Sequence, residues 1–88
     1  MGNIAVIGMG YWGKNLVRNF HELGALKTVC DQVAGCENVV TQKYSAGFTS
    51  DYRSVLADPQ IAAVAVATPA GTHHQMAREA LEAGKDVF

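Results

Sequence analysis

The stretch GMGYWGKN, from Gly8 to Asn15, decides how the rest of the chain is interpreted. It fits G-x-G-x-x-G, the turn that holds dinucleotides, and it nearly fits G-x-x-x-x-G-K-[ST], the phosphate loop of ATPases and GTPases. The apolar run at residues 3–7 precedes it and predicts a buried strand. From Trp12 onward, apolar residues recur at helical spacing. The stretch is therefore expected to be the turn between a strand and a helix.

Strand and helix patterns continue to alternate along the chain. We expect further strands at residues 26–30, 46–49 and 61–67, and helices at about 12–23, 34–43, 51–56 and 72–83. The run at 61–67 is apolar without alternation, as expected of a parallel strand covered on both faces. This alternation predicts an α/β fold, a Rossmann-like doubly wound parallel sheet in strand order 3-2-1-4-5.

Local signals predict where the helices begin, end and face. Ser50 or Asp51 is expected to cap the third helix. Thr72 opens the pattern of a capping box and is expected to be the N-cap of the last helix. Gly24 and Gly84 are expected to end the helices that precede them. The side chains expected to face inward are Leu16, Val17, Phe20 and Leu23 in the first helix, Val39 and Val40 in the second, and Met76, Ala77, Ala80 and Leu81 in the last.

The composition is that of an ordinary globular domain and argues against several classes of function. Of the 88 residues, 49% are apolar and 17% charged, and the formal net charge is −1, so nucleic acid is not an expected partner. No apolar run approaches the roughly 20 residues that cross a bilayer, and the start does not have the pattern of a signal peptide. Cys30 and Cys36 match neither a disulfide framework nor a metal site, so we expect inert thiols, no bound metal and a cytoplasmic location.

The ATPase interpretation of the glycine-rich stretch explains few residues. Asn15 stands where that loop needs a Ser or Thr hydroxyl to bind magnesium, and an amide is a poor substitute. Gly10 and the early helical periodicity from Trp12 imply a turn too tight to wrap a triphosphate.

The dinucleotide interpretation explains more of them. Gly8 allows the tight turn, Gly10 lets the backbone approach a pyrophosphate, and Gly13 lets the helix pack closely on the sheet. The amides near Tyr11 and Trp12 would then point at the phosphates, where the helix dipole favours negative charge. We expect the Trp12 indole to pack in the core and its backbone amide to contact the cofactor.

An acidic residue follows the second strand, about 20 residues after the glycines. The carboxylate of Asp31 can accept hydrogen bonds from the ribose hydroxyls of an adenosine, and it would repel a 2′-phosphate. Gln32 beside it offers no positive charge, which favours NAD over NADP as the cofactor. The alternative is that the glycines serve only backbone packing and that Asp31 only caps the second helix.

The turn after the fourth strand is a third candidate part of the site. Ligands of open parallel sheets lie beyond the carboxyl ends of the central strands, where this turn leaves the sheet. Pro69 fixes the backbone, Thr68 can bond a ribose or an amide, and His73 can approach a nicotinamide as a neutral donor near a helix N-terminus. Alternatively, His73 and His74 are solvated first-turn residues.

These motifs together resemble one family. The segments NIAVIGMGYWGKNL, VCD, DYRSVLADP and VATPAGTHHQMAREALEAGKDVF are similar to the N-terminal half of the Gfo/Idh/MocA (glucose-fructose oxidoreductase / inositol dehydrogenase) family, over nearly the whole chain. The GYWGKN variant resembles most the branch that oxidises UDP-N-acetylhexosamines or their uronic acids at the 3-position. The resemblance implies NAD(P)-dependent oxidation of a sugar or cyclitol hydroxyl by hydride transfer, in a homo-oligomer when full length.

The resemblance also implies roles for single residues. The pyrophosphate would lie against Gly8, Gly10, Tyr11, Trp12 and Gly13, the ribose against Asp31, and the nicotinamide end against Thr68, Pro69 and His73. A Glu-Lys-Pro motif with a catalytic Lys would follow Phe88.

The chain stops as a fifth strand begins. We therefore expect residues 1–88 to be a dinucleotide-binding domain truncated at that strand, naturally or by engineering, with no substrate domain and no activity of its own. A non-catalytic nucleotide sensor or CoA-binding module is the alternative function.

Overall fold

The computed structural model describes residues 2–8, 11–32, 37–68 and 70–88. Helices and strands alternate throughout this part of the chain, as the sequence patterns predict. The strands are β1 (Ile4–Ile7), β2 (Leu26–Cys30), β3 (Gly47–Thr49), β4 (Ala63–Val66) and β5 (Asp86–Val87). The helices are α1 (Tyr11–Glu22), α2 (Glu37–Lys43), α3 (Tyr52–Ala57) and α4 (Ala70–Glu82). Residues 34–36, expected to begin the second helix, lie outside the described residues.

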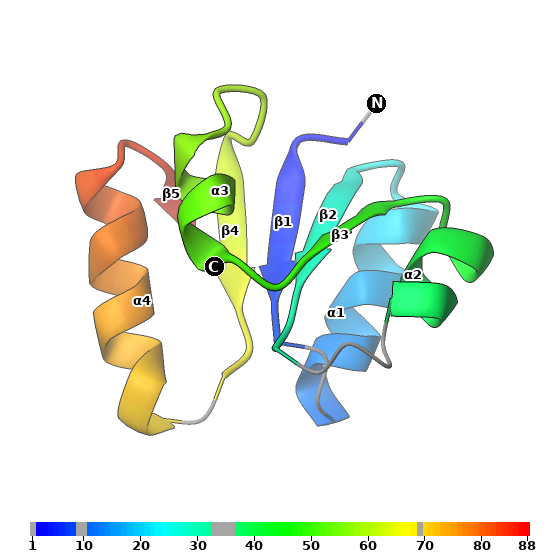
Figure 1. The fold of residues 1–88 in the computed structure, drawn as a ribbon, viewed down its shortest axis with the longest axis horizontal. Helices are drawn as coiled ribbons and strands as arrows, with labels where there is room; N and C mark the ends of the chain where they lie inside the picture. Colours follow the sequence, from blue (N-terminus) through cyan, green and yellow to red (C-terminus); the bar gives the residue numbers. More distant parts are fainter. Residues whose placement is uncertain (1, 9–10, 33–36, 69) are drawn as a thin grey trace.

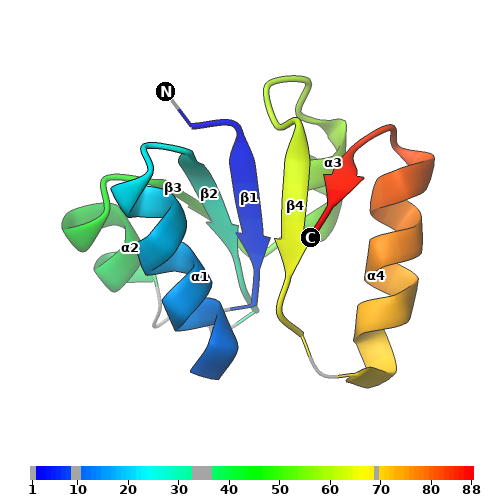
Figure 2. The same cartoon turned by 180° about the vertical axis from the view of Figure 1, so that it is seen from behind.

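The strands form one parallel sheet in the order β3-β2-β1-β4-β5, which confirms the predicted fold class and strand order. Figures 1 and 2 show the two faces of this sheet, with α3 in front in the first view and α1 in front in the second. β1 lies at the centre between β2 and β4, so the chain turns in opposite directions from it. None of the helices in the described residues is long and apolar enough to cross a membrane.

Each face of the sheet has its own core, because successive strand residues point to opposite sides. On one side, Val6 and Ala65 pack with α1 and α2 through Val17 and Val40. On the other side, the neighbouring strand residues pack with α3 and α4; the buried members of this cluster are Ala5, Ile7, Cys30, Val55, Ile61, Val64, Val66 and Ala80. The sheet is thus covered on both faces, as the unbroken apolar run of β4 predicts.

Three side chains expected to face inward are exposed. Leu23 is 76% exposed because α1 ends at Glu22, one residue before it. Val39 is 47% exposed because it lies about 100° around the helix from Val40. Val40 is fully buried against the sheet, so Val39 points away from it. Leu81 is 62% exposed for the same reason, because Ala80 takes the inner position.

The capping predictions had opposite outcomes. Asp51 is the N-cap of α3, and its side chain accepts a hydrogen bond from the backbone N–H of Arg53. The capping box at Thr72 was wrong, because α4 begins at Ala70 and Thr72 is already inside the helix.

Lys85 is a buried charged residue that sequence analysis did not single out. It is 7% exposed, and its ammonium group donates to the backbone carbonyls of Asp58 (2.9 Å) and Ile61 (2.7 Å). The turn before β5 is thereby bonded to the segment that joins α3 to β4. A lysine between Gly84 and Asp86 looks like a surface residue, so no local pattern predicts this role.

Candidate functional site

The carboxyl ends of the central strands are level with one another. Ile7 at the end of β1 pairs with Cys30 of β2 on one side and with Val66 of β4 on the other. The next residue on each strand is Gly8, Asp31 or Ala67, so these three residues meet at one edge of the sheet. The backbone ladder reaches them as well, because the Gly8 N–H donates to the Cys30 carbonyl at 2.7 Å.

Gly8 is where the turns after β1 and β4 touch. Its φ of +96° lies in the left-handed region that side chains rarely adopt. A Cβ placed on it would lie 3.2 Å from the Ala67 carbonyl and 3.3 Å from the Thr68 methyl carbon. Both observations require glycine here, as the tight-turn interpretation of the motif predicts.

Gly13 is the contact between α1 and this turn. A Cβ on Gly13 would overlap the Gly8 carbonyl oxygen and lie 2.8 Å from its carbon, so α1 can approach the turn only without a side chain there. The helix begins at Tyr11, and three residues therefore separate it from β1. That turn is as short as the dinucleotide motif requires, which argues against a loop that wraps a triphosphate.

The next strand contributes an acidic group. Asp31 is half-buried, and its backbone N–H donates to the Thr49 carbonyl at 3.1 Å, which continues the β2–β3 ladder. Burial and, to a smaller extent, the nearby carboxylates of Asp31 and Asp51 together raise the pKa of the Cys30 thiol to about 11. The edge of the sheet beyond β2 is therefore negatively charged, and the thiol stays protonated and unreactive at neutral pH.

Thr68 and His73 follow β4. Thr68 is half-buried, and its hydroxyl donates to the sulfur of Met76 at 3.7 Å. His73 is exposed as the fourth residue of α4, so it belongs to the first turn of that helix as predicted. Gly10 and Pro69 lie outside the described residues, and for Tyr11 and Trp12 the structure describes the helical backbone but not the side chains.

Sequence analysis missed two residues behind this edge. Tyr52, the first residue of α3, donates its hydroxyl to the Met76 carbonyl at 2.7 Å. Met76 was expected only to face inward, yet it contacts both Tyr52 and Thr68. A tyrosine directly after a helix cap is an ordinary surface position, so nothing in the sequence indicates these contacts.

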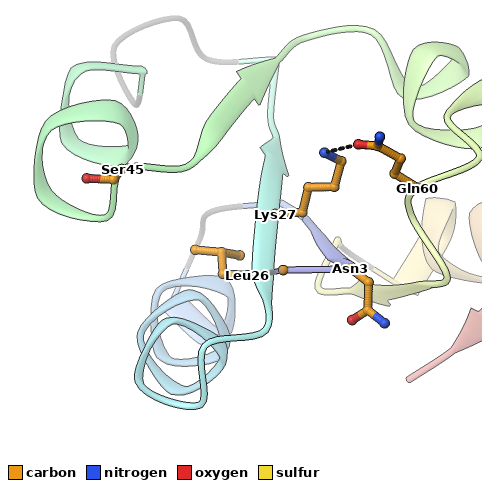
Figure 3. Close-up of a pocket in the computed structure, with 6 residues that line it drawn as sticks. Asn3, Leu26, Lys27, Ser45 and Gln60 are labelled. Carbon is orange, nitrogen blue, oxygen red and sulfur yellow. Dashed lines mark hydrogen bonds between the residues drawn. The ribbon is translucent and has the colours of Figure 1, made fainter.

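A shallow hollow lies at the opposite edge of the sheet, where the strands begin (Figure 3). Its lining residues are Gly2, Asn3, Leu26, Lys27, Ser45 and Gln60. The ammonium group of Lys27 donates to the Gln60 side chain at 3.0 Å across it. None of the predicted site residues that the structure describes lines this hollow, and it is distinct from the edge that carries Gly8 and Asp31.

Among known proteins, the chain is similar to oxidoreductases. The description "oxidoreductase family, NAD-binding Rossmann fold" (Gfo/Idh/MocA) matches residues 2–88. Scyllo-inositol 2-dehydrogenase (NAD(+)) of Bacillus subtilis is 37% identical over an alignment 91 residues long, with 96% of this chain and 26% of that protein covered. An uncharacterised oxidoreductase of the same organism is 35% identical over 86 residues, with 94% of this chain and 25% of that protein covered.

Solved structures with the same fold include enzymes that act on two substrate classes. A scyllo-inositol dehydrogenase from Lactobacillus casei with bound NAD(H) and scyllo-inositol is 27% identical, with a TM-score of 0.89 over 97% of this chain and 26% of that one. A UDP-N-acetylglucosamine 3-dehydrogenase from Acidithiobacillus ferrooxidans is 26% identical, with a TM-score of 0.83 over 96% and 27%.

The chain spans about a quarter of the length of the curated relatives that it matches. Since the family description covers residues 2–88, the match includes the glycine turn, Asp31 and the turn after β4. These residues belong to the Gfo/Idh/MocA oxidoreductase family and form a domain of its NAD-binding Rossmann fold.

Proposed function

We propose that these 88 residues bind NAD at the carboxyl edge of the sheet, as part of a longer dehydrogenase that oxidises a sugar or cyclitol hydroxyl. The observation that carries the proposal is the convergence of three turns: Gly8, Asp31 and Thr68 follow three neighbouring strands and meet at one edge. Bound NAD would supply the hydride acceptor for oxidation of the substrate alcohol. This chain's own residues would bind and orient it.

The geometry fits a dinucleotide in two respects. The turn between β1 and α1 has no room for a Cβ at Gly8 or Gly13, so the backbone itself faces the edge beside the N-terminus of a twelve-residue helix. Free amides at such a helix end suit the two negative phosphates. Asp31 lies one strand over, as required for a carboxylate that accepts hydrogen bonds from ribose hydroxyls. Thr68 and His73 would then lie toward the nicotinamide.

The test is calorimetric titration of the chain with NAD, ADP-ribose and NADP. We expect NAD and ADP-ribose to bind and NADP to bind more weakly, because the Asp31 carboxylate repels a 2′-phosphate. Asp31→Asn is expected to weaken NAD and ADP-ribose binding about tenfold or more, since hydrogen bonds to a charged group are lost. The same change should narrow the preference for NAD over NADP.

Asp86→Asn is the matched control, because Asp86 is an exposed carboxylate on the edge strand β5. It should leave all three affinities unchanged. If Asp31→Asn binds NAD as the original chain does, the ribose assignment is wrong. If the original chain binds neither NAD nor ADP-ribose, the proposed function itself is wrong. Saturation transfer from the protein to the adenosine protons alone would instead favour a nucleotide sensor.

The substrate would be bound by parts of the enzyme outside these 88 residues, so we propose that the chain alone turns nothing over. The GYWGKN turn favours a nucleotide sugar over a cyclitol. The test is NADH formation by the whole protein with UDP-N-acetylglucosamine and with scyllo-inositol. Turnover of scyllo-inositol alone would contradict the nucleotide-sugar preference, and turnover by the isolated chain would contradict its inactivity.

A further inference from the structure

Met76 joins three parts of the molecule that are separate in the sequence. It lies on α4 and is half-buried beside the core cluster that Tyr52 also packs against. Its carbonyl accepts the Tyr52 hydroxyl at 2.7 Å, and its sulfur accepts the Thr68 hydroxyl at 3.7 Å. A carbonyl oxygen has two lone pairs, so it can accept the Tyr52 bond in addition to a helical one. α3, α4 and the turn after β4 therefore meet at this residue.

The Tyr52 hydroxyl is a stable donor. Burial and, to a smaller extent, the charges of Glu79 and Cys30 together raise the pKa of Tyr52 to about 12. The hydroxyl therefore keeps its proton at every pH at which the domain would work. It can donate to Met76 throughout that range.

Two parts of the carboxyl edge are fixed in different ways: Gly8 and Asp31 form one part, and the residues after β4 form the other. Gly8 and Asp31 are held by backbone hydrogen bonds of the sheet, 2.7 Å and 3.1 Å long, which do not involve Tyr52. Thr68 contacts the Met76 side chain, and His73 lies one helical turn before Met76 on α4. A small shift of α4 would thus move Thr68 and His73 more than Gly8 and Asp31, which the sheet holds.

We propose that Tyr52 is a positioning residue for the nicotinamide end of the site, acting through Met76 on Thr68 and His73. This inference rests on the proposed function, because it assigns that end of the edge to the nicotinamide. It goes beyond that function in one respect: a residue outside every nucleotide-binding motif determines how well half of the cofactor is held. Loss of this positioning would weaken the binding of NAD but not of ADP-ribose, because ADP-ribose lacks the nicotinamide that this part of the site would contact.

The experiment compares NAD with ADP-ribose in Tyr52→Phe, which keeps the ring and removes the donor. We expect the dissociation constant for NAD to rise about fivefold and that for ADP-ribose to change less than about twofold, the range expected for one hydrogen bond. Saturation transfer to the nicotinamide protons should fall relative to the adenine protons. Equal losses for both ligands, or a lower melting temperature with an unchanged ratio, would show a purely structural role and overturn the inference.

Two further variants keep the test decisive. Tyr44→Phe is the matched control, because Tyr44 packs on the opposite face of the sheet, edge-on to His21. It should change neither affinity. Met76→Leu removes the sulfur acceptor but keeps the carbonyl that accepts from Tyr52, so it should weaken NAD binding alone, by less than Tyr52→Phe. An unchanged NAD affinity in Met76→Leu would refute the step through Thr68, even if Tyr52→Phe failed to fold. Failure of ADP-ribose to bind the original chain would refute the proposed function as well.

Discussion

The two edges of the sheet differ in what their polar groups do. At the amino edge, the ammonium groups of Lys27 and Lys85 are bonded to a side chain and to backbone carbonyls of the same chain. At the carboxyl edge, Gly8 and Asp31 bring backbone and carboxylate groups from separate strands to one place.

The hollow lies at the amino edge, yet the converging turns lie at the other. The proposed binding site therefore rests on the convergence of backbone turns and not on this hollow. Strand order explains this convergence. The chain leaves the neighbouring strands β1 and β4 toward opposite faces at the carboxyl edge, so the turns after these two strands lie side by side there.

The largest effect is expected at the carboxyl edge from Gly13→Ala. The added Cβ would overlap the Gly8 carbonyl, which is backbone and cannot move aside cheaply. We expect a loss of about 3 kcal/mol or more in the free energy of unfolding, measured with urea. Gly71→Ala is the control, because a Cβ there meets nothing within 4 Å. It should raise stability by about 0.5 kcal/mol through helix propensity. Equal stability of the two variants would contradict the close packing of α1 on the turn.

At the amino edge, Lys85→Met should have the next largest effect. Two carbonyls at 2.9 and 2.7 Å lose their donor in a buried position, so we expect a loss of about 2 kcal/mol in the free energy of unfolding. Lys27→Met is the control, since its partner Gln60 is exposed and can bond to water; less than about 0.5 kcal/mol should be lost. NAD affinity measured well below the melting temperature should not change in either variant. A weaker affinity in Lys85→Met would mean that the two edges are coupled.

The smallest effect is a pH dependence at the carboxyl edge. The pKa of Cys30 rises from 9.0 to about 11 on folding, so the thiol stays protonated to a higher pH in the folded state than in the unfolded state. Stability from this group is complete below pH 9 and is lost as the pH rises toward 11. Unfolding with urea at pH 8, 9.5 and 11 should show this fall, and Cys30→Ala should make it shallower. Tyr52→Phe serves as a comparison, because the pKa of Tyr52 is raised to about 12 and its contribution is lost at higher pH. An identical fall in Cys30→Ala would show that burial of the thiol is not its cause.

Much of the fold was predictable because its signals are local. The need for glycine at positions 8 and 13, the alternation of strands and helices and the Asp51 cap each depend on residues close in the chain, and the structure confirms them. The errors at Val39 and Leu81 have a different origin. Apolar residues at adjacent helical positions both match an inward pattern, and only packing against the sheet decides which one is buried.

The Thr72 error shows the limit of capping signals. A Thr followed three residues later by Gln is a valid capping box, but helix α4 begins two residues earlier, at Ala70. Short motifs of this kind compete with the geometry of the turn that precedes them. The turn after β4 must start beside Gly8, and this contact is set by strands far apart in the sequence.

The sequence by itself determined the order of the elements, because apolar periodicity is a local signal. It also determined the glycines at the first turn and the acidic residue after the second strand, because these depend on backbone freedom or charge at a single position. Only the tertiary structure decided that Lys85 is buried, that Tyr52 reaches Met76 and that Gly13 touches Gly8. Those contacts join residues that the chain separates, some by more than twenty positions. Their energies depend on burial and on donor geometry, which no local pattern encodes.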